Sequence, residues 1–227
     1  MKGQFEMEIH TIILWALSVL EIILVIYIYS RYQRTGSIYS LCGLLLGFSL
    51  MSFFVGTLMT LNSNDIRLLV ARAAFFSGGI SFVSLYAFSI YYPIRVFSKQ
   101  DFIRLSIWLP LVILLPFTML MPGFVNEVIV EKGNIDIVPG SYFWIFMIFT
   151  VIYCLSAIVM LVSKINRISG EQKKQLLIVI IIIGLSGILA VITNQLLPVF
   201  GIPFNKVYGP ESAGVVSMVV ALIAMKK

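Results

Sequence analysis

Seven apolar runs, each about as long as a lipid bilayer is thick, constrain the fold of this chain more than any other feature. The runs occupy residues 11–30, 38–61, 70–94, 105–121, 142–162, 176–197 and 207–225. A helix of about 20 apolar residues crosses the hydrocarbon core of a membrane. A helix also satisfies its own backbone hydrogen bonds where no water is present. We therefore expect an all-α integral membrane protein, a seven-transmembrane-helix bundle forming a single domain over residues 1–227.

The composition argues against a soluble fold. Hydrophobic residues make up 60% of the 227 residues and charged residues 11%, whereas a soluble domain is about half apolar and about a quarter charged. The formal net charge of +6 does not indicate nucleic-acid binding, because the basic residues lie between the apolar runs. We expect membrane lipids as partners, and no nucleic acid.

Lysine and arginine are distributed unevenly between the two sides of the predicted membrane. Eleven of the 16 follow the first, third and fifth runs or end the chain. They are Arg31, Arg34, Arg95, Lys99, Arg104, Lys164, Arg167, Lys173, Lys174, Lys226 and Lys227. Because cytoplasmic loops carry an excess of Lys and Arg, we expect the N-terminus outside and the C-terminus in the cytoplasm.

A small extracytoplasmic β-hairpin is expected in the longest external connection, between the fourth and fifth helices. Residues 124–131 and 135–138 are rich in β-branched side chains and flank Lys132-Gly133-Asn134. Two such runs around a Gly-Asn turn predict a hairpin. Because an isolated hairpin is only marginally stable, we expect it to pack on the helix ends as a lid.

Glu21 is the candidate functional residue inside the membrane. It lies about 10 residues before Arg31, which is about 15 Å of helix and places it near the middle of the bilayer. A carboxyl group there is costly and suggests a functional site. The alternative is a structural role, as a protonated glutamate bonded to a neighbouring helix or facing an internal water cavity.

A second polar group gathers at the predicted outer ends of the helices. Arg72 opens the third helix, Asn194 and Gln195 close the sixth, and Tyr208 and Glu211 open the seventh. An Arg72–Glu211 ion pair would be favoured where the dielectric constant is low. The group predicts the polar floor of a ligand pocket open to the outside. The alternative is snorkelling and helix capping at the membrane interface.

Other patterns yield negative predictions or weak constraints. Cys42 and Cys154 fall inside apolar runs, so we expect buried free thiols. The sequence has no paired metal-ligand spacing, phosphate-binding loop or catalytic constellation. We therefore expect no cofactor, no metal and no enzymatic activity. Gly43 and Gly47 match a small-xxx-small pattern that is common in membrane helices and permits a homodimer.

Four segments together resemble the N-terminal seven-transmembrane region of bacterial sensor histidine kinases. They are Val70-Ala71-Arg72, the Pro-Gly-Ser-Tyr-Phe-Trp stretch at 139–144, Gln172-Lys173-Lys174-Gln175, and Asn194 through Pro210-Glu211. The resemblance covers nearly the whole chain. It implies a multi-pass sensor in the bacterial cytoplasmic membrane that detects an extracytoplasmic or intramembrane signal. It also implies relay through the seventh helix to a cytoplasmic output module such as a histidine kinase.

The resemblance supplies no ligand-binding residues, because the ligands of the family are largely undefined. The given sequence stops at Lys227, so we expect no kinase or other output domain within it. The main alternative is a small proton-coupled secondary transporter that uses Glu21. A third reading is a structural membrane subunit that docks a partner through its helix faces.

Overall fold

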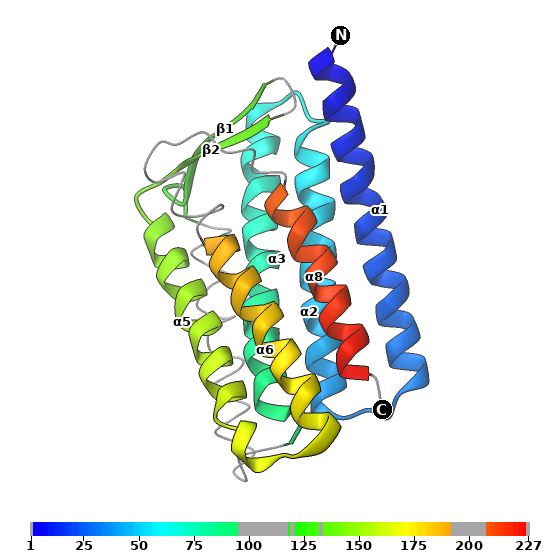
Figure 1. Ribbon diagram of the computed structural model, residues 1–227. Coiled ribbons are helices and arrows are strands. Elements are labelled where there is room, and N and C mark those ends of the chain that lie inside the picture. The colour runs from blue at the N-terminus through cyan, green and yellow to red at the C-terminus, as the bar shows by residue number, and fades with distance from the viewer. Residues whose placement is uncertain (1, 95–117, 119–120, 132–133, 192–207, 226–227) are drawn as a thin grey trace.

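The computed structural model describes residues 2–94, 118, 121–131, 134–191 and 208–225. Its elements are α1 (Lys2–Arg31), α2 (Gly36–Leu58), α3 (Asn64–Tyr91), β1 (Val125–Glu131), β2 (Asn134–Pro139), α5 (Phe143–Val162), the 3-10 turn η2 (Ile165–Arg167), α6 (Gly170–Val191) and α8 (Tyr208–Met225). The helices run alongside one another, and the two strands lie across the end of the bundle at which α1 begins (Figure 1). The end of α8 lies at the opposite end (Figure 1).

The six described helices overlap six of the seven predicted runs. Within the described residues, four spans have the length and composition to cross a membrane, namely Ile9–Arg31, Gly36–Leu58, Asn64–Tyr91 and Phe143–Arg167. These spans support a multi-pass membrane protein. The fourth predicted helix, 105–121, falls almost entirely outside the described residues, so the count of seven and the orientation stay predictions.

The helix boundaries differ from the sequence predictions mainly at the N-terminal ends. α1 begins at Lys2 rather than at residue 11, and α3 begins at Asn64 rather than at residue 70. Hydropathy marks where the apolar segment begins, but a helix can continue into the polar interface. In α3, Asp65 lies in the first turn, where a negative charge is favoured by the helix dipole.

The described residues bury two separate apolar cores. The hairpin core lies beneath the strands and consists of Leu14, Leu58, Met59, Ala71, Phe124, Val125, Val128, Ile135, Phe143 and Phe146. The distal core lies toward the other end of the bundle and is largely aliphatic. Its members include Ile28, Leu41, Leu44, Leu45, Phe88, Leu161, Leu176, Val179, Val220, Ala221 and Met225.

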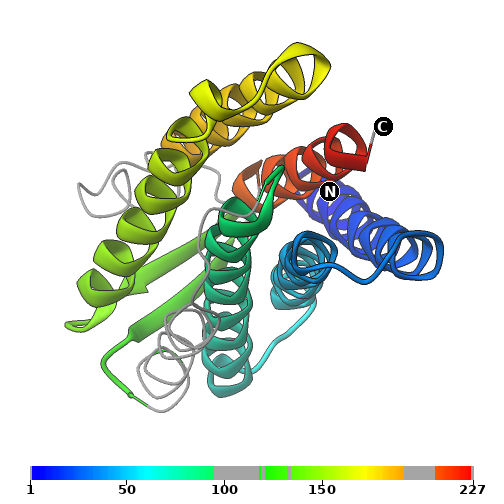
Figure 2. The ribbon, with the colours of Figure 1, turned by 90° about the horizontal axis from the view of Figure 1, so that it is seen from below.

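α2 and α3 are held together by close backbone approach. A Cβ atom added at Gly47 would lie 2.8 Å from the backbone nitrogen of Ser81, and one at Gly43 would lie 2.6 Å from Oγ of Ser84. The small-xxx-small pattern of α2 therefore serves a contact within the chain. Viewed along the bundle, α8 packs beside α1, α2 and α6, whereas α3 packs beside α2 and α5 (Figure 2).

The predicted hairpin is confirmed and packs as a lid. β1 and β2 pair antiparallel, with an irregularity between Val125 and Glu127. Phe124, immediately before β1, is fully buried. Its ring lies 5.4 Å from that of Phe75 on α3, in an edge-to-face arrangement. Burying a phenylalanine side chain contributes about 1.5–3 kcal/mol, so this ring anchors the lid to the bundle.

Two glycines bring the two ends of the hairpin into backbone contact. The amide of Gly140 donates to the carbonyl of Phe124 at 3.0 Å, and the amide of Tyr142 donates to the carbonyl of Gly123 at 3.0 Å. A Cβ atom added at Gly140 would lie 1.9 Å from the carbonyl oxygen of Gly123. Only glycine fits at position 140 without displacing the other backbone.

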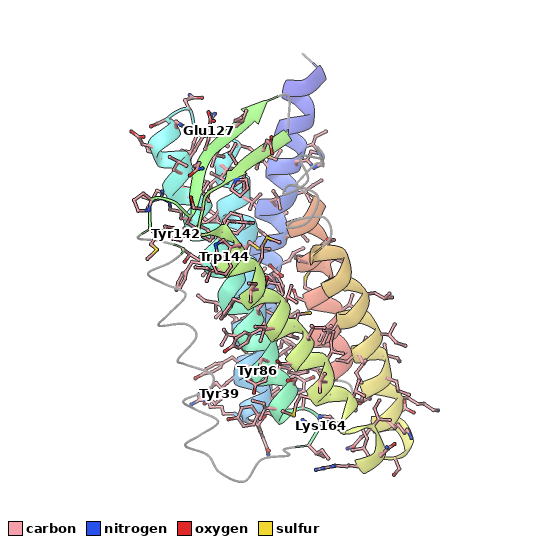
Figure 3. All side chains as sticks on the ribbon, turned by 90° about the vertical axis from the view of Figure 1, so that its left-hand side faces the viewer. Tyr39, Tyr86, Glu127, Tyr142, Trp144 and Lys164 are labelled. Atoms are coloured by element: carbon pink, nitrogen blue, oxygen red, sulfur yellow. The ribbon has the colours of Figure 1, made fainter. Side chains whose placement is uncertain are left out.

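Lys164 joins the distal ends of α3 and α5, at the end of the bundle opposite Glu127 of the hairpin (Figure 3). Its side chain is fully buried. Its ammonium group donates to the carbonyl oxygens of Ser89 at 2.6 Å, Ile90 at 2.9 Å and Tyr92 at 2.7 Å. The last carbonyl groups of a helix lack partners within it, and the helix dipole favours a cation there. All three N–H bonds of the ammonium group are therefore used.

Gly140→Ala should destabilise the protein by about 1–3 kcal/mol, because the added methyl group overpacks the crossing of the two backbones. The matched control is Gly184→Ala, since a Cβ at position 184 has no neighbour within 4 Å. Alanine also favours a helix more than glycine does. Unfolding of the purified variants in detergent measures both changes. Equal stability of the two variants would contradict the close backbone contact between Gly140 and Gly123.

Lys164→Met should cost about 2–4 kcal/mol, because three buried carbonyl groups lose a charged donor. Lys174→Met is the control, since the side chain of Lys174 is 74% exposed. The same unfolding measurement applies. If the two lysine variants lose stability to the same extent, Lys164 does not hold α3 to α5.

Candidate functional site

Glu21 is fully buried where α1 meets α8. Its Oε1 atom lies 2.7 Å from Oγ of Ser217 on α8. Its Oε2 atom is buried and has no hydrogen-bond partner among the described residues. The carboxyl group is therefore only half satisfied in a part of the bundle where an unpaired polar atom is costly.

Gly214 on α8 lies directly against the carboxyl group. A Cβ atom added there would lie 3.4 Å from Oε1 and 3.8 Å from Oε2 of Glu21. Gly214 and Ser217 are three residues apart, so they share one face of α8. Ser217 Oγ also lies 2.7 Å from the carbonyl oxygen of Gly214, one turn earlier in α8.

Glu21 belongs to a set of buried polar side chains between the two apolar cores. This polar layer consists of Ser18, Glu21, Ser49, Ser52, Ser77, Ser81 and Ser217, all of which are at most 4% exposed. Ser18 and Ser49 place their Oγ atoms 3.0 Å apart and so connect α1 to α2. Small hydroxyl side chains allow close helix packing and hydrogen bonding inside a membrane.

Arg72 belongs to the hairpin end rather than to the site around Glu21. Its Nη2 atom donates to the carbonyl oxygen of Pro122 at 3.1 Å, which ties α3 to the segment that leads into β1. Its Nε atom is buried and has no hydrogen-bond partner among the described residues. Along α3, Arg72 lies five residues before Ser77, the nearest residue of the polar layer on that helix, or about 7.5 Å away.

The other predicted site residues are only partly described. Asn194 and Gln195 lie outside the described residues, and the side chains of Tyr208 and Glu211, at the start of α8, do too. The predicted Arg72–Glu211 pair and the outer pocket therefore stay predictions. Cys42 and Cys154 are buried free thiols, as expected.

Sequence reasoning identified Glu21 but missed its partners. Ser217 is one serine among many in the membrane helices, and 196 positions separate it from Glu21. The one signal in the sequence is that Ser217 follows Gly214 by three residues, which places a hydroxyl group and a glycine on the same face of α8. In the sequence, Lys164 indicates only the orientation of the helices, because nothing local to it reveals that its side chain turns inward.

Ser217→Ala should weaken the contact between α1 and α8 by about 1 kcal/mol, which is within the range for hydrogen bonds in membrane proteins. Ser186→Ala is the control, because Ser186 bonds only its own helix, at the carbonyl of Ile182. Unfolding of Ser217→Ala, of Glu21→Leu and of the double variant completes a double-mutant cycle that isolates the energy of the pair. A coupling energy of zero would show that the two side chains do not interact.

One known protein family matches nearly the whole of the chain. The family model for the N-terminal 7TM region of histidine kinase matches residues 13–226, which include α8 and most of α1. No curated protein matches the chain. In these kinases the N-terminal region is a sensory membrane domain and not the catalytic part. The chain therefore belongs to the family of N-terminal 7TM regions of histidine kinases, as its sequence resemblance predicted.

Proposed function

We propose that this domain detects an extracytoplasmic or intramembrane signal and relays it through α8 to a cytoplasmic output module such as a histidine kinase. The observation that carries the proposal is the contact between Glu21 and Ser217, which ties α8 to α1 inside the bundle. The proposed setting is the bacterial cytoplasmic membrane, with the N-terminus outside and seven spans. A homodimer is also part of the proposal.

A continuous set of contacts supports relay from the hairpin to α8. Phe124 and Leu14 belong to the same hairpin core, so the lid and α1 share buried contacts. Glu21 lies two turns further along α1 and bonds Ser217. Beyond Ser217, α8 enters the distal core through Val220 and Ala221. A displacement of the lid or of α1 therefore has a short physical route to the end of α8.

The hairpin end is the proposed position of a small ligand. Its predicted polar residues are Arg72, Asn194, Gln195, Tyr208 and Glu211. The Nε atom of Arg72 is buried and has no hydrogen-bond partner among the described residues. This supports the proposal, because it leaves a donor that a ligand at the hairpin end could use. A guanidinium group favours an anionic or carbonyl-bearing ligand. A ligand bound at this position would act on the lid and on the beginnings of α3 and α8, which are the elements from which the proposed relay starts.

A chimera tests the relay. Residues 1–227 are joined in frame to the dimerisation and catalytic domains of a histidine kinase, and autophosphorylation is measured in membrane vesicles. Gly214→Val adds bulk against Glu21, and Ser217→Ala removes its partner. Each should change basal autophosphorylation by at least about fivefold, the lower end of typical allosteric coupling.

The controls are equivalent changes on α6. Gly184→Val adds bulk where a Cβ has no neighbour within 4 Å, and Ser186→Ala removes a hydroxyl that bonds only its own helix. Both should leave autophosphorylation within about twofold of the unmodified chimera. An active chimera whose activity is unchanged by the α8 variants would refute the relay through this contact.

A further inference from the structure

Ser217 makes two short contacts that one hydroxyl hydrogen cannot serve. Its Oγ atom lies 2.7 Å from Oε1 of Glu21 and 2.7 Å from the carbonyl oxygen of Gly214. A hydroxyl group has one hydrogen to donate, and a carbonyl oxygen can only accept. The hydrogen between Ser217 and Gly214 must therefore come from Ser217. The hydrogen between Ser217 and Glu21 must then come from Glu21.

An ionised Glu21 would not fit this arrangement. A carboxylate only accepts hydrogen bonds, so it would compete with Gly214 for the single hydrogen of Ser217. One pair of oxygen atoms would then face each other at 2.7 Å without a hydrogen between them. A hydrogen shared by both acceptors would be poorly aligned for each, and hydrogen bonds weaken steeply with misalignment.

Among the described side chains of the helices packed around Glu21, no cation bonds its carboxyl group. α2 and α8 contain no Lys, Arg or His between their first and last described residues. The titratable residues of the three helices are Lys2, Glu6, Glu8, His10, Tyr27, Tyr29 and Arg31 on α1, Tyr39 and Cys42 on α2, and Tyr208 and Glu211 on α8. Glu21 forms no bond with any of these whose side chains the structure describes. The nearest basic residues of α1 are about 15 Å away along the helix.

We propose that Glu21 holds a proton in this conformation and that loss of the proton breaks the α1–α8 contact, which makes this pair a proton-operated switch on α8. In the protonated form, Oε1–H donates to Ser217, and Ser217 donates to the carbonyl of Gly214. On ionisation the Oε1–H bond breaks, the proton passes to water, and Glu21 keeps the electron pair as a carboxylate.

Ionisation changes the packing of α8 as well as its hydrogen bonds. The carboxylate must gain a donor or water, because an unpaired buried charge is far more costly than a buried neutral acid. Gly214 presents no side chain, and so no hydrogen-bond donor, toward Oε1 and Oε2. In this proposal α8 therefore moves away from α1 to let water reach the carboxylate. The consequence for signalling rests on the proposed function, but the presence of the proton does not.

Infrared spectroscopy of the whole chain in an alkyl maltoside detergent, which has no ester carbonyl group, detects the proton directly. The unmodified protein at neutral pH should show one carboxylic-acid C=O band that shifts to lower frequency in D2O. The band should be lost in Glu21→Gln and kept in Glu171→Gln, whose glutamate is 72% exposed. In Ser217→Ala the band should move to higher frequency, because the acid loses its acceptor.

A pH titration of the unmodified protein completes the test and needs no variant to fold. The acid band should disappear as the pH rises while the chain stays folded, and the separation of spin labels on α1 and α8 should grow over the same interval. Absence of the band at every pH at which the chain is folded would overturn the proposal. Carboxylate bands that depend on sodium rather than on pH would overturn it in favour of a cation site. An unresponsive kinase chimera would refute the relay but leave the proton in place.

Discussion

The absence of water inside a bilayer is the constraint on which the rest of this structure depends. Every buried polar group needs a partner within the protein. Lys164 meets this requirement in full, since its ammonium group donates three hydrogen bonds to three carbonyl oxygens. Glu21 meets this requirement only in part, because one carboxyl oxygen bonds Ser217 and the other has no partner among the described residues. The first residue fixes a helix end, and the second leaves a contact that a single proton can alter.

The features that sequence could predict are local ones. Apolar length predicted the described helices, and two β-branched runs around a Gly-Asn turn predicted the strands. Glu21 was identifiable because a carboxyl in an apolar run is conspicuous. The partners of Glu21 and Lys164 were not, because they lie far away in the chain. Ser217 and Ser89 resemble every other serine in these helices until the bundle assembles. The outer pocket remains a prediction from pattern alone.

Small residues illustrate the same limit. The spacing of Gly43 and Gly47 indicates a helix face that another helix can approach closely. It does not specify which helix. In the bundle this face meets Ser81 and Ser84 of α3, so the pattern is fully used within one chain. The proposed homodimer would therefore need a different surface.

The position of the polar layer between two apolar cores explains why α8 suits a relay. The hairpin core holds the first half of α1 through Leu14, and the distal core holds α8 through Val220 and Ala221. Apolar contacts are non-directional and tolerate small shifts, whereas a hydrogen bond between Glu21 and Ser217 is lost when its geometry changes. A change at the hairpin end is therefore registered most sharply in this layer. Because α8 is tied to α1 there, the proposed loss of the Glu21 proton would act directly on the packing of α8.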